Sequence, residues 1–361
     1  MSQSAPASIG ASRLVTLAEL RGLATALMQP FRVHAQIDTI NERTTSNGSP
    51  FLEANLVDAT DSLVWRVFDN NPWFRKLPEF PVHSFVELNA EWIDTGKFGI
   101  EPRNAHLRLL DEAEAHTLQL GSPETAARQQ ADWEEILAKL NTIADPRLHQ
   151  LCRLFVERFA DRYRRTAAAR ENHHARRGGL VEHVAQMMRA SDALCTVYTH
   201  LNRDLLTAGI LFHDCGKMWE NSYPESGFSQ QHNLHGEMLG HIPLGLELVN
   251  KLWRDLMDSP DAASWAELVP ASELVRLHLL HLIGAHHGQY EFGSPVLPKT
   301  PEAIALHHID NIDAKLEMLK RGYATSKELA PHIHDRFRPW PTRIVTPLEP
   351  FKPEQETPDE S

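Results

Sequence analysis

"GILFHDCGKMWE", residues 209–220, sets the central question of this sequence. An apolar run ends in two adjacent polar residues, His213 and Asp214, and Lys217 follows one helical turn later. Burial of an unpaired charge costs several kcal/mol, so a carboxylate in such a run needs a partner. The stretch is therefore either part of a metal site or a polar interruption of a buried helix.

Other histidines and acids of the second half share this setting, because each lies within an apolar stretch of helical periodicity. A site for two divalent metals needs five or more imidazole and carboxylate ligands from different helices. Adjacent residues on a helix point about 100° apart, so Asp214 can bridge two ions at a helix edge. The candidate metal ligands, in chain order, are His183, His213, Asp214, His241, His286, His287 and Asp310.

The composition is that of a globular protein. A chain of 361 residues, 42% of them hydrophobic, is long enough for two domains with separate cores. The formal net charge of −12 argues against non-specific coating of nucleic acid, although a local basic face is compatible with it. Neither a membrane-spanning apolar stretch nor a signal peptide is found, so we expect a cytoplasmic protein. Three cysteines without CxxC spacing are expected in the core.

Residues 31–110 have the pattern of a small β domain. Turn signals, the first at Ser46-Asn47-Gly48-Ser49, separate five β-rich runs. These short strands and the order of the turns favour a small closed barrel of the OB type, with another small barrel or a sandwich as the alternative. Most of the aromatic residues are expected in the barrel core or on an interdomain packing surface rather than on a base-stacking surface. Residues 1–30 are a separate N-terminal segment in this scheme.

From residue 111 onward the pattern is helical. Residues 111–145 begin as a polar stretch that contains Gly121-Ser122-Pro123, which predicts a linker or helical connection. Apolar positions three and four apart then predict an all-helical domain over 146–325, with helices over 180–198, 203–218, 241–257, 273–287 and 301–322. The proline-rich stretch 326–361 has an acidic end and is predicted to be extended or disordered. The expected fold class is a multidomain α+β protein.

The order H…HD…H…HH…D resembles the HD superfamily of metal-dependent phosphohydrolases, which have an all-helical fold. The stretches "HHARRGGLVEH", "NRDLLTAGILFHDCGK", "GEMLGHIPLG" and "HLIGAHHGQYEFGSPVLPKTPEAIALHHIDNIDAK" resemble, more narrowly, the YhaM-type 3′→5′ exoribonucleases. In that family an OB-type domain precedes the HD domain. The resemblance extends from about residue 31 to residue 320.

The resemblance implies two bound divalent ions. His183, His213, Asp214 and Asp310 would hold one ion, and His241 with His286, His287 or both would hold the other, with Asp214 shared. Manganese, magnesium, iron and cobalt all suit such ligands. Asp214 and Lys217 are the candidate catalytic residues, with Lys217 expected to approach the scissile phosphate as a positive charge. The alternative for Lys217 is a solvent-exposed lysine near a helix end.

An arginine-rich stretch precedes the first candidate ligand. Residues 158–177 hold seven arginines and two acids, so the entrance to the site can be basic despite the acidic total. Arg176, Arg177 and His174 are the candidate substrate-binding residues. The alternative is a solvated helix face.

These features predict a metal-dependent 3′→5′ exonuclease that releases nucleoside 5′-monophosphates. Its expected partner is a single-stranded nucleic acid, RNA being favoured over DNA, and self-association is left open. One alternative is an HD phosphohydrolase that acts on a small nucleotide or cyclic dinucleotide. Another is a nucleic-acid-binding protein in which the HD and OB folds have no catalytic activity.

Overall fold

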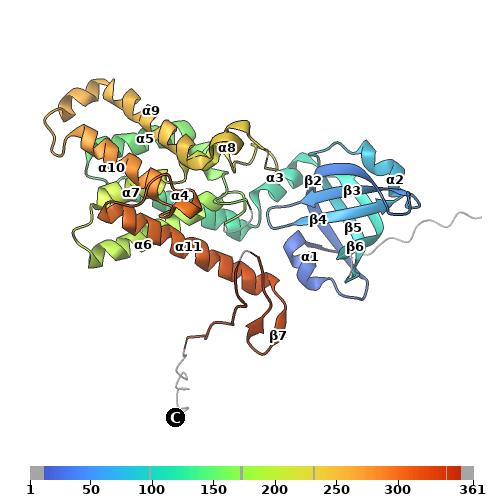
Figure 1. Ribbon diagram of the computed structural model, residues 1–361. Helices are drawn as coiled ribbons and strands as arrows, with labels where there is room; N and C mark the ends of the chain where they lie inside the picture. Colours follow the sequence, from blue (N-terminus) through green and yellow to red (C-terminus); the bar gives the residue numbers. More distant parts are fainter. Residues whose placement is uncertain (1–11, 97–98, 171–173, 231, 339, 351–361) are drawn as a thin grey trace, which may run out of the picture.

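The computed structural model describes residues 12–96, 99–170, 174–230, 232–338 and 340–350 (Figure 1). An antiparallel β half is followed by a helical half, and a small lobe with two short strands follows the last long helix. This confirms the expected fold class of a β domain followed by an all-helical domain. No helix among the described residues is long and apolar enough to cross a membrane.

The β half is a sheet with the strand order β4-β3-β2-β5-β6, and β1 pairs with β2 in parallel. Its strands are β1 (Arg13–Val15), β2 (Gln29–Thr44), β3 (Pro50–Val57), β4 (Ser62–Phe68), β5 (Phe85–Asp94) and β6 (Ile100–Leu109). The long β2 pairs with β5 along its first part and with β3 along its second, and a register shift between Ile37 and Thr39 separates the two parts. One strand thus connects both sides of the sheet.

The described residues form no ladder between β4 and β6, so the hydrogen-bonded closure expected of the barrel is not seen. The short helices α2 (Trp73–Lys76) and η1 (Leu77–Glu79) follow β4 instead. The indole of Trp73 donates to the Ala105 carbonyl of β6 at 2.7 Å and packs edge-on against Trp65 of β4. This side chain contacts both end strands where a ladder would otherwise join them.

Alternating residues of the strands build the core of the β half, as a period of two requires. In β4, for example, Leu63, Trp65 and Val67 are buried. Trp92 is also buried, in line with the prediction that most aromatic residues lie in the core. Helix α1 (Leu17–Leu23) adds Leu17 and Leu20 to the same core, so the chain joins the β half well before residue 31.

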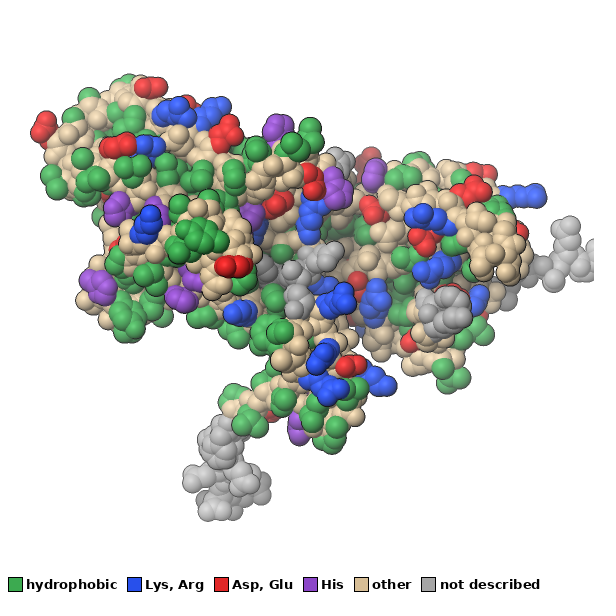
Figure 2. Space-filling view, in the orientation of Figure 1, with side chains coloured by type: hydrophobic (Ala, Val, Ile, Leu, Met, Phe, Trp, Pro, Cys, Tyr) green, Lys and Arg blue, Asp and Glu red, His purple; other side chains and the backbone are tan. Residues whose placement is uncertain are grey.

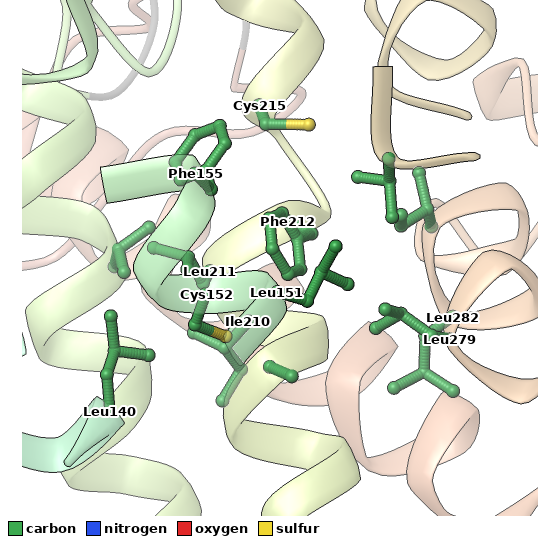
Figure 3. Close-up of a cluster of buried hydrophobic side chains, with 14 of the residues drawn as sticks. Leu140, Leu151, Cys152, Phe155, Ile210, Leu211, Phe212, Cys215, Leu279 and Leu282 are labelled. Atoms are coloured by element: carbon green, nitrogen blue, oxygen red, sulfur yellow. The ribbon is translucent and has the colours of Figure 1, made fainter. Parts of the chain in front are cut away.

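The helical half contains α3 (Glu112–Leu120), α4 (Pro123–Leu140), α5 (Pro146–Arg164), α6 (Gly179–Val197), α7 (Arg203–Phe212), η2 (Cys215–Trp219), α8 (Leu234–Leu239), α9 (His241–Met257), η3 (Pro260–Trp265), α10 (Ser272–Ala285), η4 (Tyr290–Phe292) and α11 (Pro301–Thr325). Figure 3 shows part of its core, where Phe155, Phe212 and Leu282 meet from α5, α7 and α10. Cys152 and Cys215 are buried there as free thiols.

The connection expected over residues 111–145 is mostly helical. Ser122 caps α4 and Pro123 occupies its first turn, which are common signals for a helix start. Trp133, Ile136 and Leu140 lie three and four residues apart and pack into the helical core. Residues 123–140 are therefore a structural part of the helical half rather than a linker.

The lobe after α11 contains β7 (Glu328–Ala330) and β8 (Ile333–His334), which form a hairpin. Ile344 is buried, and Val345 forms a bridge to Ile333. Within the segment predicted to be an extended or disordered tail, a short hairpin and a few apolar side chains thus form a small folded lobe. Residues 351–361 of the predicted tail lie outside the described residues.

Candidate metal centre

The His213–Asp214 pair lies at a helix junction. Asn202 caps α7, which ends at Phe212, and the tighter η2 begins at Cys215. The predicted helix over 203–218 is therefore interrupted at this pair. At Gly216 a Cβ atom would lie only 1.9 Å from the His241 carbonyl oxygen, so the missing side chain lets η2 approach the start of α9. The interruption and the glycine bring His241 close to Asp214.

A first group of candidate ligands lies where α6, α7 and α11 meet. The Nε2 atoms of His183 and His213 are 3.3 Å apart. Asp310 Oδ1 lies 3.4 Å from His183 Nε2, and Asp214 Oδ2 lies 3.2 Å from His213 Nε2. These four side chains are the set that the family resemblance implies for one metal ion.

A second group lies where α9 and α10 meet. The Nε2 atoms of His241 and His287 are 3.3 Å apart. His241 Nε2 and His286 Nε2 each lie 3.6 Å from Asp214 Oδ1. Both His286 and His287 direct Nε2 toward this group, so both stay candidate ligands. Asp214 turns one carboxylate oxygen to each group, as a bridging ligand would.

Each of the five rings directs Nε2 inward and uses Nδ1 to hold its orientation. Two rings donate from Nδ1 to carboxylates, His183 to Asp313 at 2.6 Å and His241 to Glu220 at 2.9 Å. The other three rings donate to backbone carbonyl oxygens, His213 to Ile210 at 2.8 Å, His286 to Ile283 at 2.8 Å and His287 to Phe292 at 2.6 Å. A proton fixed on Nδ1 leaves the Nε2 lone pair for a metal ion.

These side chains fit divalent cations. Lone pairs of two nitrogens at 3.3 Å repel each other unless a positive charge lies between them, and this contact occurs once in each group. Asp214 Oδ1 and His286 Nε2 are buried without a hydrogen-bond partner among the described residues. Buried polar atoms are rarely left in this state without a function. Imidazole nitrogen and carboxylate oxygen suit manganese, iron, cobalt or magnesium.

The acids of the centre are held in their ionised form. Burial alone would raise the pKa of Asp214, but the charges of Lys217 and His213 hold it well below its usual range. Burial would also raise the pKa of Asp310, but the interaction with His183 outweighs burial. The pKa of Asp310 is therefore lowered as well. Both carboxylates are therefore available as metal ligands at neutral pH.

Lys217 lies inside the centre. Its ammonium group donates to Asp214 Oδ2 at 2.6 Å, and the residue is only 7% exposed. The alternative of a solvent-exposed lysine is therefore wrong. A buried positive charge beside the ligand shared by both groups is in a position to meet an anionic substrate.

His174 and Arg176, two of the three residues expected to bind substrate, belong to a buried network. His174 is 1% exposed, and its Nε2 lies 3.1 Å from the Asp313 carboxylate. Arg176 donates from Nε to Glu182 at 3.1 Å and from its terminal nitrogen to Glu317 at 3.2 Å. His174 therefore supports the first group from behind. Arg176 belongs to the same network and also lines the cleft beside Arg177, so it stays a candidate substrate contact.

Arg177 lies at a cleft between the two halves. Its guanidinium donates to the carbonyl oxygens of Pro224 at 2.7 Å and Glu225 at 2.9 Å, neither of which neutralises its charge. The cleft has a volume of about 530 Å³. Its lining includes Ala59 of the β half and Gln129, Arg164, Arg165, Arg177 and Glu225 of the helical half.

Asp313 and Glu220 are site residues that the sequence reasoning missed. Asp313 lies three residues after Asp310 on α11, and Glu220 ends the quoted stretch three residues after Lys217. This spacing places each near a recognised site residue on a helical turn, which is a usable signal. Their partners, however, come from α6 and α9, and only the fold shows those contacts.

A family model described as the HD domain matches residues 180–315. The helical half is therefore an HD domain, the class of metal-dependent phosphohydrolases that the ligand order indicates. A curated relative, the 3′-5′ exoribonuclease YhaM of Geobacillus sp. (strain WCH70), is 32% identical over 293 residues, which cover 80% of this chain and 84% of the relative. The chain belongs to the YhaM family of HD-domain proteins.

Solved structures give weaker matches. RecG bound to a three-way DNA junction is 15% identical over 28% of this chain and 13% of its own, with a TM-score of 0.23. A replication factor A related protein from Methanobacterium thermoautotrophicum is 17% identical over 27% of this chain and 92% of its own, with a TM-score of 0.21. These scores are too low to carry an argument about fold or function.

Proposed function

We propose that this protein is a metal-dependent 3′→5′ exoribonuclease that shortens single-stranded RNA and releases nucleoside 5′-monophosphates. The observation that carries the proposal is that the two ligand groups, both built from imidazoles and carboxylates, share Asp214 in a chain of the YhaM family. The polarity and the RNA substrate come from the name of the relative. A cytoplasmic location agrees with this substrate and is part of the proposal.

His183, His213, Asp310 and one oxygen of Asp214 would hold one divalent cation, and His241, His286, His287 and the other oxygen would hold a second. Such cations lower the pKa of a bound water and offset the negative charge of a phosphodiester. Asp214 sets the spacing of the two groups because a single carboxylate serves both. Lys217 adds a positive charge where the negative charge of the scissile phosphate increases during the reaction.

Arg177 is the candidate contact to the strand away from the scissile bond. Its side chain is fixed by backbone carbonyl oxygens, so little side-chain entropy is lost when a phosphate binds. Arg164 and Arg165 line the same cleft and add positive charge. Arg176 lines this cleft as well, but its charge is paired with Glu182 and Glu317, so we assign the main substrate contact to Arg177, whose guanidinium donates to backbone carbonyl oxygens.

The direct test uses single-stranded RNA labelled at either end, with chelator-treated protein and added Mn²⁺. We expect a ladder of shortened products from the 5′-labelled strand and immediate release of mononucleotide from the 3′-labelled strand, both only with metal. A matched DNA oligomer measures the preference for RNA. Turnover of small nucleotides or cyclic dinucleotides without any shortening of RNA would contradict the proposal.

A further inference from the structure

The end of α11 and the lobe that follows it carry a concentrated positive charge in a chain whose formal net charge is −12. Residues 320–343 contain six basic side chains and only two acidic ones, Glu328 and Asp335. The six basic residues, called here the basic patch, are exposed: Lys320, Arg321, Lys327, Arg336, Arg338 and Arg343. Figure 2 shows Lys and Arg side chains gathered over this lobe, which carries β7 in Figure 1.

The lobe has a defined structure that holds the patch in place. The His334 amide donates to the Ile344 carbonyl and the Thr346 amide donates to the His332 carbonyl, both at 2.9 Å. The Tyr323 hydroxyl donates to the Val345 carbonyl at 3.0 Å and ties the lobe to the end of α11. A charged patch on an ordered support loses less entropy on binding than one on a flexible tail.

Most of the charge in the patch is not matched by acids. Within the described residues, no carboxylate lies within salt-bridge distance of Arg336, Arg338 or Arg343, while Lys320 lies 3.4 Å from Glu317. Three exposed guanidinium groups close together in the sequence repel one another at low salt. A polyanion would relieve this repulsion by replacing mobile counterions.

An aromatic pair lies among these arginines. The rings of Phe337 and Trp340 are nearly parallel, with an interplanar angle of 5° and centroids 6.5 Å apart. Phe337 packs on Gly322, where a Cβ atom would lie 2.3 Å from its ring. Trp340 remains partly exposed. Flat aromatic surfaces beside basic groups are the features that bind unpaired bases and their phosphates together.

We propose that the basic patch and Trp340 form a second binding surface for single-stranded nucleic acid, which holds the strand outside the metal centre. The inference rests on the proposed function. The helix α11 connects the two places, because it contains Asp310 of the metal centre and ends at Thr325 beside the lobe. At 1.5 Å per residue these positions are about 22 Å apart along the helix, which a strand of several nucleotides spans.

The experiment compares two triple variants of the full chain. Arg336→Gln/Arg338→Gln/Arg343→Gln removes three of the six positive charges of the patch, and Arg153→Gln/Lys251→Gln/Arg254→Gln removes the same number from exposed positions of α5 and α9. Fluorescence anisotropy of a labelled single-stranded RNA in EDTA then gives Kd over a range of salt concentrations. This measurement of RNA binding needs no hydrolysis. Its result is therefore independent of the activity assay that tests the proposed nuclease function.

We expect the patch variant to raise Kd by about tenfold and to lower the slope of log Kd against log salt by about 2, since each phosphate contact to a single strand contributes about 0.7. The control variant should change both quantities much less. Trp340→Ala should raise Kd with the salt slope unchanged, because stacking is not a counterion effect. Equal losses in both triple variants would overturn the inference. So would a patch variant that binds RNA normally and loses only the binding of vesicles containing anionic lipid.

Discussion

The two ligand groups of the metal centre differ in burial and in what supports them. The burial of the histidines differs: His183 and His213 of the first group are fully buried, whereas in the second group His286 keeps 1% and His241 13% of the side chain exposed. Asp310 of the first group is 16% exposed. Burial and His286 lower the pKa of His287 to about 4, while Asp310 and Asp313, acting against burial, raise the pKa of His183 to about 9. The first group is thus more strongly surrounded by acids than the second.

Behind the first group lies the network of Asp313, His174, Glu182 and Arg176, which reaches α4 through Gln129. The second group has Glu220 alone as a carboxylate support among the described residues. We infer that the first group is a rigid, tight metal site and that the second is the weaker site where substrate enters. Four predictions test this difference.

Replacement of the shared ligand should have the largest effect. Asp214→Ala removes an oxygen from both groups, so we expect loss of both metal ions and no hydrolysis above background. Metal content by mass spectrometry and release of mononucleotides measure the two effects, and circular dichroism checks the fold. Asp258→Ala, at an exposed position after α9, is the control. An Asp214→Ala protein that retains one tightly bound ion would show that the groups are independent.

Loss of a supporting carboxylate should lower the free energy of unfolding much more behind the first group than behind the second. Glu182→Gln leaves the Arg176 charge without its nearest acid, and breaking such a pair costs about 3 kcal/mol of unfolding free energy. Glu220→Gln should cost less than about 1 kcal/mol, because 27% of the Glu220 side chain is exposed. Urea unfolding at pH 7 measures both values. Similar losses would contradict the difference between the groups.

The difference in stability between the wild type and Glu182→Gln should depend on pH, and the sign of this dependence follows from the pKa of Glu182. Burial would raise this pKa, but His174 and Arg176 lower it far below 4.5. The stabilisation by the ionised carboxylate is therefore complete above the unfolded-state pKa and is lost as the pH falls toward the folded-state value. We expect the gap in stability between the wild type and Glu182→Gln to be constant from pH 5 upward and to shrink below about pH 4.5.

The ligand order could be predicted from the sequence because each ligand interrupts an apolar helical pattern. The predicted helix start at His241 is also correct, because Gly240 ends the preceding helix. The tertiary roles could not be predicted in the same way. His174 and Arg176 resemble exposed, basic substrate contacts in a linear sequence, and only the arrival of Asp313 and Glu317 from α11 shows that their polar groups are already used.

The fold was predictable to a similar degree. Turns and alternation identify the strands, but sheet closure depends on how Trp73 packs between β4 and β6, which no local pattern reveals. The lobe after α11 was missed because its prolines and the acidic end of the chain favour an extended tail. A few apolar contacts, such as that of Ile344, are enough to order it.

The smallest effect, and the most direct comparison, concerns the carboxylates that orient one histidine in each group. Asp313→Asn weakens the bond that orients His183, and Glu220→Gln does the same for His241. Loss of such a partner lowers metal affinity by about 10 to 100-fold. Because we assign tighter binding to the first group, Asp313→Asn should weaken the tighter step of a calorimetric Mn²⁺ titration, and Glu220→Gln the weaker step.

Glu317→Gln is the control for that titration, because Glu317 belongs to the same network but contacts Arg176 rather than a candidate ligand. It should leave both binding steps within about threefold of the wild type, since the contacts that connect it to His183 pass through Arg176, Glu182, His174 and Asp313. If Asp313→Asn and Glu220→Gln shift the same step, the two carboxylates support one joint site. The separation of the centre into a tight and a weak half would then be wrong, even with every ligand assignment intact.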